Sequence, residues 1–169
     1  TCDSCKYNVG NKKEKGKDEF GSSMSGRHMI FYGSPGTGKT TVARILTGFL
    51  YQYGYIKKNK CVEVDGNFLK AGADTALKTE LVIRQAYDGV LFVDEAYSLM
   101  EGDRSGKEAI ATLIKQMEDN RDRFILILAG YTNEMKNLLN LNPGFESRIK
   151  EYLDFPDYDD QEMKDIFVS

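Results

Sequence analysis

An eight-residue segment in the first quarter of the chain has the residue types and spacing of a phosphate-binding loop. It reads Gly33-Ser-Pro-Gly-Thr-Gly-Lys-Thr40 and matches the pattern G-x-x-x-x-G-K-S/T. Its glycines let the backbone curl so that successive N–H groups point inward, Lys39 can reach the β- and γ-phosphates, and Thr40 can offer its hydroxyl to Mg²⁺. The residues predicted to bind the nucleotide are Gly33, Ser34, Pro35, Gly36, Thr37, Gly38, Lys39, Thr40 and Thr41.

Two adjacent carboxylates end an apolar run later in the chain, Val90-Leu-Phe-Val-Asp-Glu95. Asp94 is placed to hold the Mg²⁺ together with Thr40, and Glu95 is placed to polarise an attacking water as a general base. Adjacent acids can also simply end a strand and cap the next helix. A nucleotide kinase would usually have acceptor-binding residues here, so the pair after a phosphate-binding loop favours hydrolysis by water.

Two further segments carry polar residues that could act on a nucleotide. In Leu126-Ile-Leu-Ala-Gly-Tyr-Thr-Asn133, the residues that follow the strand could touch the γ-phosphate and the water. Thr132 and Asn133 are the candidates, with Tyr131 third, and the register stays open. Arg148 ends a turn-rich connection in Asn142-Pro-Gly-Phe-Glu-Ser-Arg148; a lone arginine is usually a solvated surface residue, but one supplied by a neighbouring subunit can speed phosphoryl transfer by about 10³ to 10⁵.

The elements that must position these residues follow from the hydrophobic pattern. Continuous apolar runs predict five strands, at residues 28–33, 60–65, 89–94, 124–129 and 149–155. Apolar residues at helical spacing predict helices at 38–53, 74–87, 106–120 and near 133–139. Apolar strands that alternate with amphipathic helices indicate an α/β fold with a parallel sheet covered on both faces.

Size, composition and charge exclude several classes of protein. The 169 residues fit one domain, and with 41% hydrophobic and 29% charged residues they contain no apolar run near the ~20 residues that span a bilayer. The net charge is −3 and the basic residues are scattered, so direct nucleic-acid binding is not expected. His28 opens an apolar run and is expected to be structural. No secretory signal is visible, so we expect a cytoplasmic protein.

Together and in this order, these segments resemble an AAA+ ATPase, and more narrowly the CbbX-type red rubisco activases and the stage V sporulation protein K-like ATPases. The likeness spans about residues 28–158. Its most specific strings are His28-Met-Ile-Phe with the loop and Thr-Val-Ala-Arg44 after it, Gly89-Val-Leu-Phe-Val-Asp-Glu-Ala-Tyr97, Gln116-Met-Glu-Asp-Asn-Arg-Asp122, Leu128-Ala-Gly-Tyr131, Asn142-Pro-Gly144, Ser147-Arg148-Ile149 and Phe155-Pro-Asp-Tyr158.

The resemblance implies a role for each candidate residue. Lys39 and Thr40 would belong to Walker A, Asp94 and Glu95 to Walker B, and Thr132 or Asn133 would be sensor 1. Arg148 would be an arginine finger that completes the site of a neighbouring subunit. The implied fold is a P-loop NTPase three-layer sandwich with strand order 5-1-4-3-2, the implied particle is a homo-oligomeric ring, typically a hexamer, and the implied cofactors are ATP and Mg²⁺.

We expect three parts along the chain: a partial N-terminal helix and connector at 1–27, the nucleotide-binding core at 28–156, and at 157–169 the start of a truncated C-terminal helical lid. The sequence departs from the family in the loop Leu69-Lys-Ala-Gly-Ala73, which lacks the aromatic with which relatives grip a threaded polypeptide. We also expect no sensor 2, and only the start of the lid, within these 169 residues.

The function expected first is Mg²⁺-dependent ATP hydrolysis that drives remodelling of a protein client. The alternatives are a nucleotide-binding module that assembles partners with little turnover, and a DNA-handling AAA+ loader, which the acidic charge balance disfavours. No membrane partner is expected. These 169 residues alone are expected to hydrolyse ATP weakly or not at all, because the neighbour's arginine and the lid are both needed to close the site.

Overall fold

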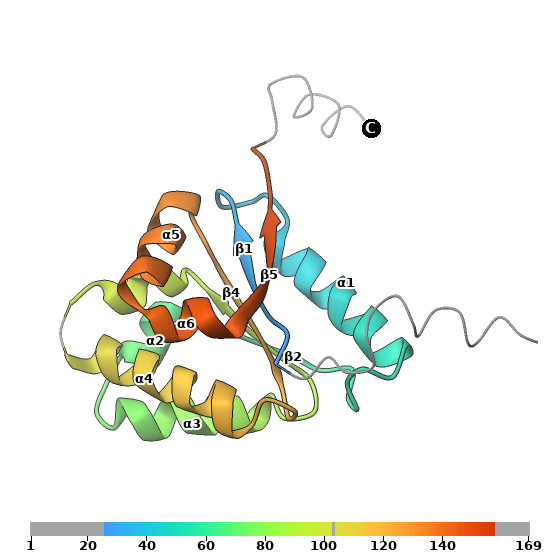
Figure 1. Ribbon diagram of the computed structural model, residues 1–169, viewed down its shortest axis with the longest axis horizontal. Helices are drawn as coiled ribbons and strands as arrows, with labels where there is room; N and C mark the ends of the chain where they lie inside the picture. Colours follow the sequence, from blue (N-terminus) through green and yellow to red (C-terminus); the bar gives the residue numbers. More distant parts are fainter. Residues whose placement is uncertain (1–25, 103, 158–169) are drawn as a thin grey trace, which may run out of the picture.

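The computed structural model describes residues 26–102 and 104–157 and shows a five-stranded parallel sheet in the order β2-β3-β4-β1-β5 (Figure 1). The strands are β1 His28–Tyr32, β2 Cys61–Asp65, β3 Val90–Asp94, β4 Ile125–Gly130 and β5 Ile149–Asp154. Every pairing in the sheet is parallel. The predicted order 5-1-4-3-2 is therefore confirmed, because it is the same order read from β5 to β2.

Helices cover both faces of the sheet, which makes a three-layer sandwich (Figure 1). One face is covered by α1, Lys39–Gln52. The other carries α3 Thr75–Gln85, α4 Arg104–Asp119, α5 Thr132–Leu141 and α6 Pro143–Arg148, with the short α2 Gly66–Lys70 and the 3₁₀ helix η1 Ala96–Met100. No helix in the described part of the chain is both long and apolar enough to cross a membrane.

The central strands are apolar at nearly every position because both of their faces are covered; the exceptions include His28 at the start of β1 and Asp94 at the end of β3. Successive side chains of a strand point to opposite faces, so each central strand feeds two cores. On the α1 side, Phe31, Phe92 and Ile127 pack with Ala43 and Leu50. The continuous apolar runs of the sequence are thus explained by a sheet that has no solvent-exposed face at its centre.

The larger core lies on the other face of the sheet. Ile30, Leu91 and Leu126 from neighbouring strands pack there with Leu113 and Met117 of α4. All five side chains are at most 1% exposed. This second core therefore anchors α4, a helix that helps to hold Arg148 in position.

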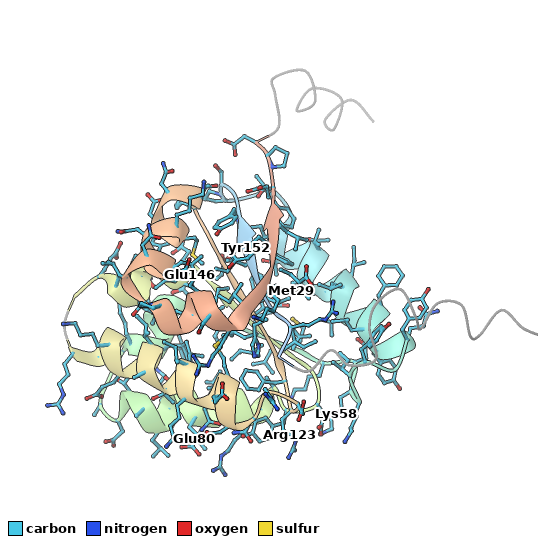
Figure 2. The ribbon with its side chains drawn as sticks, viewed as in Figure 1. Met29, Lys58, Glu80, Arg123, Glu146 and Tyr152 are labelled. Atoms are coloured by element: carbon cyan, nitrogen blue, oxygen red, sulfur yellow. The ribbon has the colours of Figure 1, made fainter. Side chains whose placement is uncertain are left out.

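Ion pairs close the edge of the sheet at which β3 and β4 begin. Asp88 lies just before β3, and its carboxylate pairs with Lys58 at 3.3 Å and with Arg123 at 3.5 Å. Figure 2 shows Lys58 and Arg123 near one another in this view. The partners come from the segments that precede β2 and β4. Burial raises the pKa of Asp88, but these two cations outweigh burial and hold the pKa below its usual range.

Three short helices were not predicted from the sequence. The segment 142–148 was predicted to be a turn-rich connection, but most of it forms α6, with Pro143 in the first turn, where a missing N–H costs nothing. The predicted strands and the longer helices are present, with ends shifted by a few residues. The N-terminal helix predicted within 1–27 and the lid predicted at 157–169 lie almost wholly outside the described residues.

His28, the first residue of β1, has the structural role predicted for it. Its ring is 1% exposed, and Nδ1 accepts a hydrogen bond from the Leu126 N–H at 3.0 Å, which ties β1 to β4. Nε2 is buried without a hydrogen-bond partner. Burial lowers the pKa of His28 to about 4, so the folded chain holds a neutral imidazole.

We predict that His28 makes the stability of the fold fall in mild acid. Its pKa is about 4 in the folded chain and 6.5 without burial, so its contribution is complete above pH 6.5 and is lost as the pH falls towards 4. The loss amounts to about 3 kcal/mol. Urea unfolding between pH 7 and 4.5 should show the free-energy gap between the wild type and His28→Asn narrowing with acid; parallel pH profiles would contradict this.

Candidate functional site

The phosphate-binding loop, residues 33–40, connects the carboxyl end of β1 to the first turn of α1. Gly36 and Gly38 have φ values of 78° and 88°, which side chains rarely allow. At Gly33 a Cβ would lie 2.5 Å from the carbonyl oxygen of Phe155. The glycines of the motif are therefore required by this backbone path, as the sequence pattern predicts.

A cavity of about 320 Å³ lies against this loop. Its wall contains most of the predicted binding residues, together with both predicted Walker B acids: Gly33, Pro35, Gly36, Gly38, Lys39, Thr40, Thr41, Asp94 and Glu95. Ser34 and Thr37 do not line it; the buried Thr37 hydroxyl donates to the Ser34 carbonyl oxygen at 2.7 Å and braces the loop. The structure thus brings the loop and the two acids, 55 residues apart from Lys39 to Asp94, to one cavity.

Lys39 is held at the centre of the loop. Its side chain is buried, and Nζ donates to the carbonyl oxygens of Gly33 at 2.8 Å and Ser34 at 2.6 Å. Burial lowers the pKa of Lys39, and the negative charges of Asp94 and Glu95 oppose that shift. The ammonium is therefore fixed between the loop and the two acids, where it can neutralise phosphate charge.

The two acids differ in backbone conformation. Asp94 ends β3, and its Oδ1 accepts a hydrogen bond from the Glu95 N–H at 2.9 Å. Glu95 has φ 46° and ψ 42°, a left-handed conformation that costs a non-glycine residue about 1–3 kcal/mol. Such strain persists where surrounding structure enforces it, and here it sits on the residue predicted to be the general base.

The oxygen ligands present fit a magnesium ion. Thr40 and Asp94 line the loop cavity and also an adjoining hollow of about 240 Å³, which Asp65 shares. Mg²⁺ is usually held by one or two protein oxygens and completes its octahedron with water and phosphate oxygens. Among the described residues no group of three or more His, Cys, Asp or Glu side chains is arranged to hold a metal ion.

The sensor candidates line two cavities that share Gly33 of the loop. Thr132 and Asn133, the first residues of α5, line a neighbouring cavity of about 420 Å³. Tyr131 lines both this cavity and the loop cavity. Tyr131 thus lines the cavity that Asp94 and Glu95 also line, while the assignment of sensor 1 to Thr132 or Asn133 stays a prediction.

Tyr97 is a residue of the site that the sequence did not single out for a role. It lies in η1 directly after Glu95, lines the loop cavity and packs its ring 5.7 Å from that of Tyr131. Burial, with the nearby Glu95 charge, raises the pKa of Tyr97 to about 12, so the phenol stays a neutral hydrogen-bond donor. The sequence feature that could have indicated this role is that Tyr97 lies two residues after the predicted general base, Glu95.

Arg148 lies far from the loop of its own chain. It ends α6, and the next residue, Ile149, pairs with His28 at the start of β1. The phosphate-binding loop follows the other end of β1, where Tyr32 pairs with Asp154. A five-residue strand is about 16 Å long, so Arg148 and the loop stand at opposite edges of the sheet.

Residues 69–73, which follow β2, include no aromatic residue. The residue directly before them is aromatic. Phe68 of α2 is 51% exposed. Lys78 of α3 places its Nζ 3.9 Å from the centre of the Phe68 ring and also donates to the Phe68 carbonyl oxygen. Phe68 lies one residue before the segment 69–73 in which the family resemblance places the aromatic, so the resemblance does not point to it.

Comparisons with known proteins agree with this geometry. A family model described as "ATPase family associated with various cellular activities (AAA)" matches residues 29–157. Protein CbbX of Cereibacter sphaeroides is 47% identical over 144 residues, which cover 82% of this chain and 47% of that protein. Stage V sporulation protein K of Bacillus subtilis is 45% identical, with 82% and 44% covered.

A chloroplastic ribulose bisphosphate carboxylase/oxygenase activase of Cyanidioschyzon merolae is 46% identical, with 84% of this chain and 50% of the relative covered. This chain spans about half the length of the curated relatives it matches. Among solved structures, the Aeropyrum pernix ORC2 protein has a TM-score of 0.60 at 22% identity, covering 90% of this chain and 47% of that one. That likeness concerns the fold.

We predict that Lys39→Met weakens nucleotide binding and leaves the fold intact. The methionine keeps the apolar stem and removes the ammonium, and a hydrogen bond to a charged group is worth enough to weaken binding by about 10- to 100-fold. Titration with a fluorescent ATP analogue measures the change. The matched control is Lys107→Ala, an exposed lysine on α4; equal affinity of the Lys39 variant and this control would contradict the prediction.

Proposed function

The chain belongs to the AAA family of ATPases, and from this premise we propose that it binds ATP with Mg²⁺ at the loop cavity and hydrolyses it. One observation carries the proposal: Asp94 and Glu95 line the same cavity as Lys39 and Thr40. The loop N–H groups and Lys39 bind the phosphates, Thr40 and Asp94 hold the magnesium, and Glu95 polarises the attacking water. Residues 28–156 form the nucleotide-binding core.

Hydrolysis takes place between subunits, with Arg148 acting on the nucleotide of a neighbour. Support comes from its position at the opposite edge of the sheet from its own loop. One surface of the subunit supplies the arginine and a different surface binds it, so the interface is head-to-tail. Such interfaces close into a ring when the rotation between neighbouring subunits brings the last subunit back to the first. The family resemblance makes a hexamer the expected ring.

The work of the ring is remodelling of a protein client. Support comes from the relatives, one of which is named as an activase of ribulose bisphosphate carboxylase/oxygenase. Rubisco is one candidate for the client protein. Exposed Phe68 on α2 offers an aromatic for contact with a client, although it stands before the loop where relatives place theirs.

A second candidate is a nucleotide-dependent assembly module with little turnover. The observation that favours it is the aromatic-free segment 69–73, which lacks the side chain that would pull on a polypeptide. The two functions share ATP binding and differ in turnover. Hydrolysis by the complete protein therefore decides between them.

We predict that Glu95→Gln in the complete protein keeps ATP binding and lowers kcat by about 100-fold or more, because the amide cannot take a proton from water. Phosphate release under saturating ATP and Mg²⁺ measures kcat, and a fluorescent analogue measures binding. Glu101→Gln is the matched control, an exposed acid six residues further along the chain. Hydrolysis that is unchanged in Glu95→Gln would remove Glu95 from the mechanism.

We predict that activity per subunit rises with protein concentration and that Arg148→Ala lowers kcat by about 10³-fold. The site needs a neighbour, so dilution that separates subunits should abolish turnover while each loop still binds ATP. Sedimentation and phosphate release over the same concentration range give the test. Concentration-independent turnover that survives Arg148→Ala would contradict hydrolysis between subunits.

A further inference from the structure

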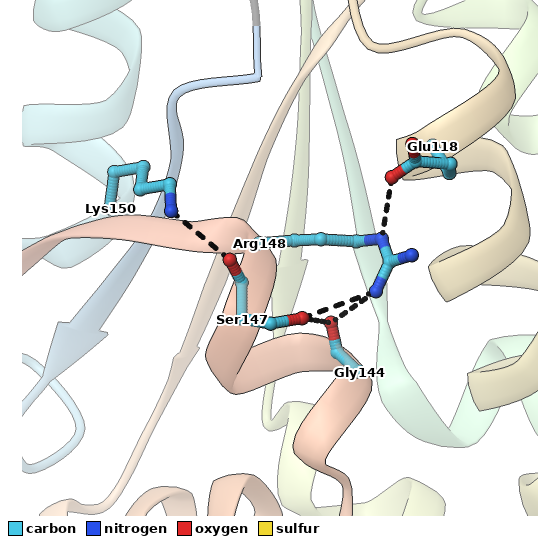
Figure 3. A network of polar contacts seen from close by, with 5 residues as sticks. All are labelled: Glu118, Gly144, Ser147, Arg148 and Lys150. Carbon is cyan, nitrogen blue, oxygen red and sulfur yellow. Dashed lines mark hydrogen bonds and ion pairs between the residues drawn. The ribbon is translucent and has the colours of Figure 1, made fainter.

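The guanidinium of Arg148 is held on two of its edges by its own subunit (Figure 3). Nη1 donates to the carbonyl oxygen of Gly144 at 3.1 Å and to the hydroxyl of Ser147 at 3.2 Å. Nε is buried and lies 3.2 Å from the Glu118 carboxylate of α4, an ion pair by distance that does not have hydrogen-bond geometry. Only 29% of the Arg148 side chain is exposed, so this residue is not a freely moving surface arginine.

The remaining nitrogen is left available. None of the contacts that the described residues make with this guanidinium involves Nη2. In Figure 3, Nη2 points away from Gly144 and Ser147. Two edges of the group are thus in contact with its own subunit, and Nη2, which has no partner among the described residues, can donate to an acceptor from another molecule.

The two helices that hold Arg148 are themselves fixed to one another. Gly144 of α6 lies against Ile114 of α4, where an added Cβ would be 2.9 Å from the Ile114 Cγ2. Met117, next to Glu118, is 1% exposed, and Phe145, next to Gly144, is fully buried. The Glu118 carboxylate and the α6 carbonyl are therefore presented to Arg148 by a packed helix pair.

We propose that Glu118 is a positioning residue for the arginine that acts in trans. Its charge attracts the Nε edge of Arg148 and limits the rotation of the side chain, so that Nη2 is already in place to donate when a neighbouring subunit brings its bound phosphate. The inference rests on the proposed function, in which Arg148 completes a neighbour's site. It also gives a role to the segment Gln116-Met-Glu-Asp-Asn, to which the site itself assigns none.

The pair positions the arginine without withholding it from the neighbour. Glu118 is 57% exposed, and exposed pairs are weak and screened by salt. The carboxylate also contacts Nε, so Nη2 stays available while the pair is intact. An arginine side chain has many rotamers when it is free, and a misplacement of about 1 Å can lower a rate by about 100-fold.

The test measures ATP hydrolysis by the assembled complete protein carrying Glu118→Ala or the isosteric Glu118→Gln. Glu118→Ala should lower kcat by about 10- to 100-fold with the KM for ATP changed less than about twofold, because the arginine acts on the transition state and not on ATP binding. Glu118→Gln, which keeps the shape and one acceptor oxygen, should fall between Glu118→Ala and the wild type.

The matched control is Glu108→Ala, which removes another ion-paired carboxylate of the same helix. Glu108 pairs with Arg104 at 2.8 Å and is 39% exposed. It is ten residues from Glu118 in α4 and makes no contact with Arg148. This variant should hydrolyse ATP at the wild-type rate.

A mixing experiment separates positioning in trans from a defect inside the subunit. A Glu118→Ala subunit keeps its own loop and Glu95 but supplies a poorly placed arginine, whereas a Glu95→Gln subunit cannot hydrolyse but supplies a well-placed one. Mixed rings should therefore exceed the mean activity of the two separate preparations. A purely structural role of Glu118 would give no such gain.

The possible failures can be told apart by Arg148→Ala. If that variant loses activity while both Glu118 variants keep wild-type kcat, Glu118 does not position the arginine. A loss in Glu118→Ala without recovery on mixing also overturns the inference. If Arg148→Ala itself keeps full activity, the proposed action of Arg148 on a neighbour is wrong, and the positioning role falls with it.

Discussion

The structure depends on the parallel alignment of three buried strands. β1, β3 and β4 run side by side and end at the same edge of the sheet, with Tyr32 beside Gly130 and Val93 beside Leu128. Residues that follow these strands must therefore meet, however far apart they are in the sequence. The phosphate-binding loop, the acids Asp94 and Glu95, and Tyr131 share one cavity for this reason. The apolar cores on both faces hold the alignment, and the polar site is its consequence.

The same alignment separates Arg148 from that cavity. Because β1 and β5 are parallel, a residue before β5 lies at the edge where β1 begins, and the loop lies where β1 ends. The chain thus carries the loop cavity where β1 ends and Arg148 where β1 begins, which in the proposed function are the two halves of a site. A head-to-tail assembly is the arrangement in which both halves are used. The packing of α6 on α4, at Gly144 and Ile114, fixes where the arginine is presented.

Much of the fold could be predicted from the sequence, and the reasons are physical. Strands covered on both faces form nearly continuous apolar runs, so β1, β3 and β4 are distinct in the sequence. The five- and six-residue helices η1 and α6 are too short to show a helical period. The sequence pattern therefore does not predict η1 and favours a turn in place of α6. The strand order came from the family resemblance, and the structure confirms it.

The candidate site was predictable where one backbone motif defines it. The loop needs glycines at fixed positions, and Gly33, Gly36 and Gly38 supply them. Whether Tyr131 or Thr132 faces the phosphates depends on how the chain leaves β4, which is a tertiary property without a sequence signal. The position of Tyr97 is likewise a tertiary property, because η1 begins directly after Glu95, whose backbone is left-handed.

The central claim is that the two halves of a site come from two subunits. A structure of the assembled Glu95→Gln protein with ATP and Mg²⁺ tests it most directly. The account predicts γ-phosphate oxygens within hydrogen-bonding distance of Lys39 from one subunit and of Arg148 from the next. An assembly in which the γ-phosphate is contacted by residues of a single subunit, with Arg148 of every subunit in solvent, would contradict it.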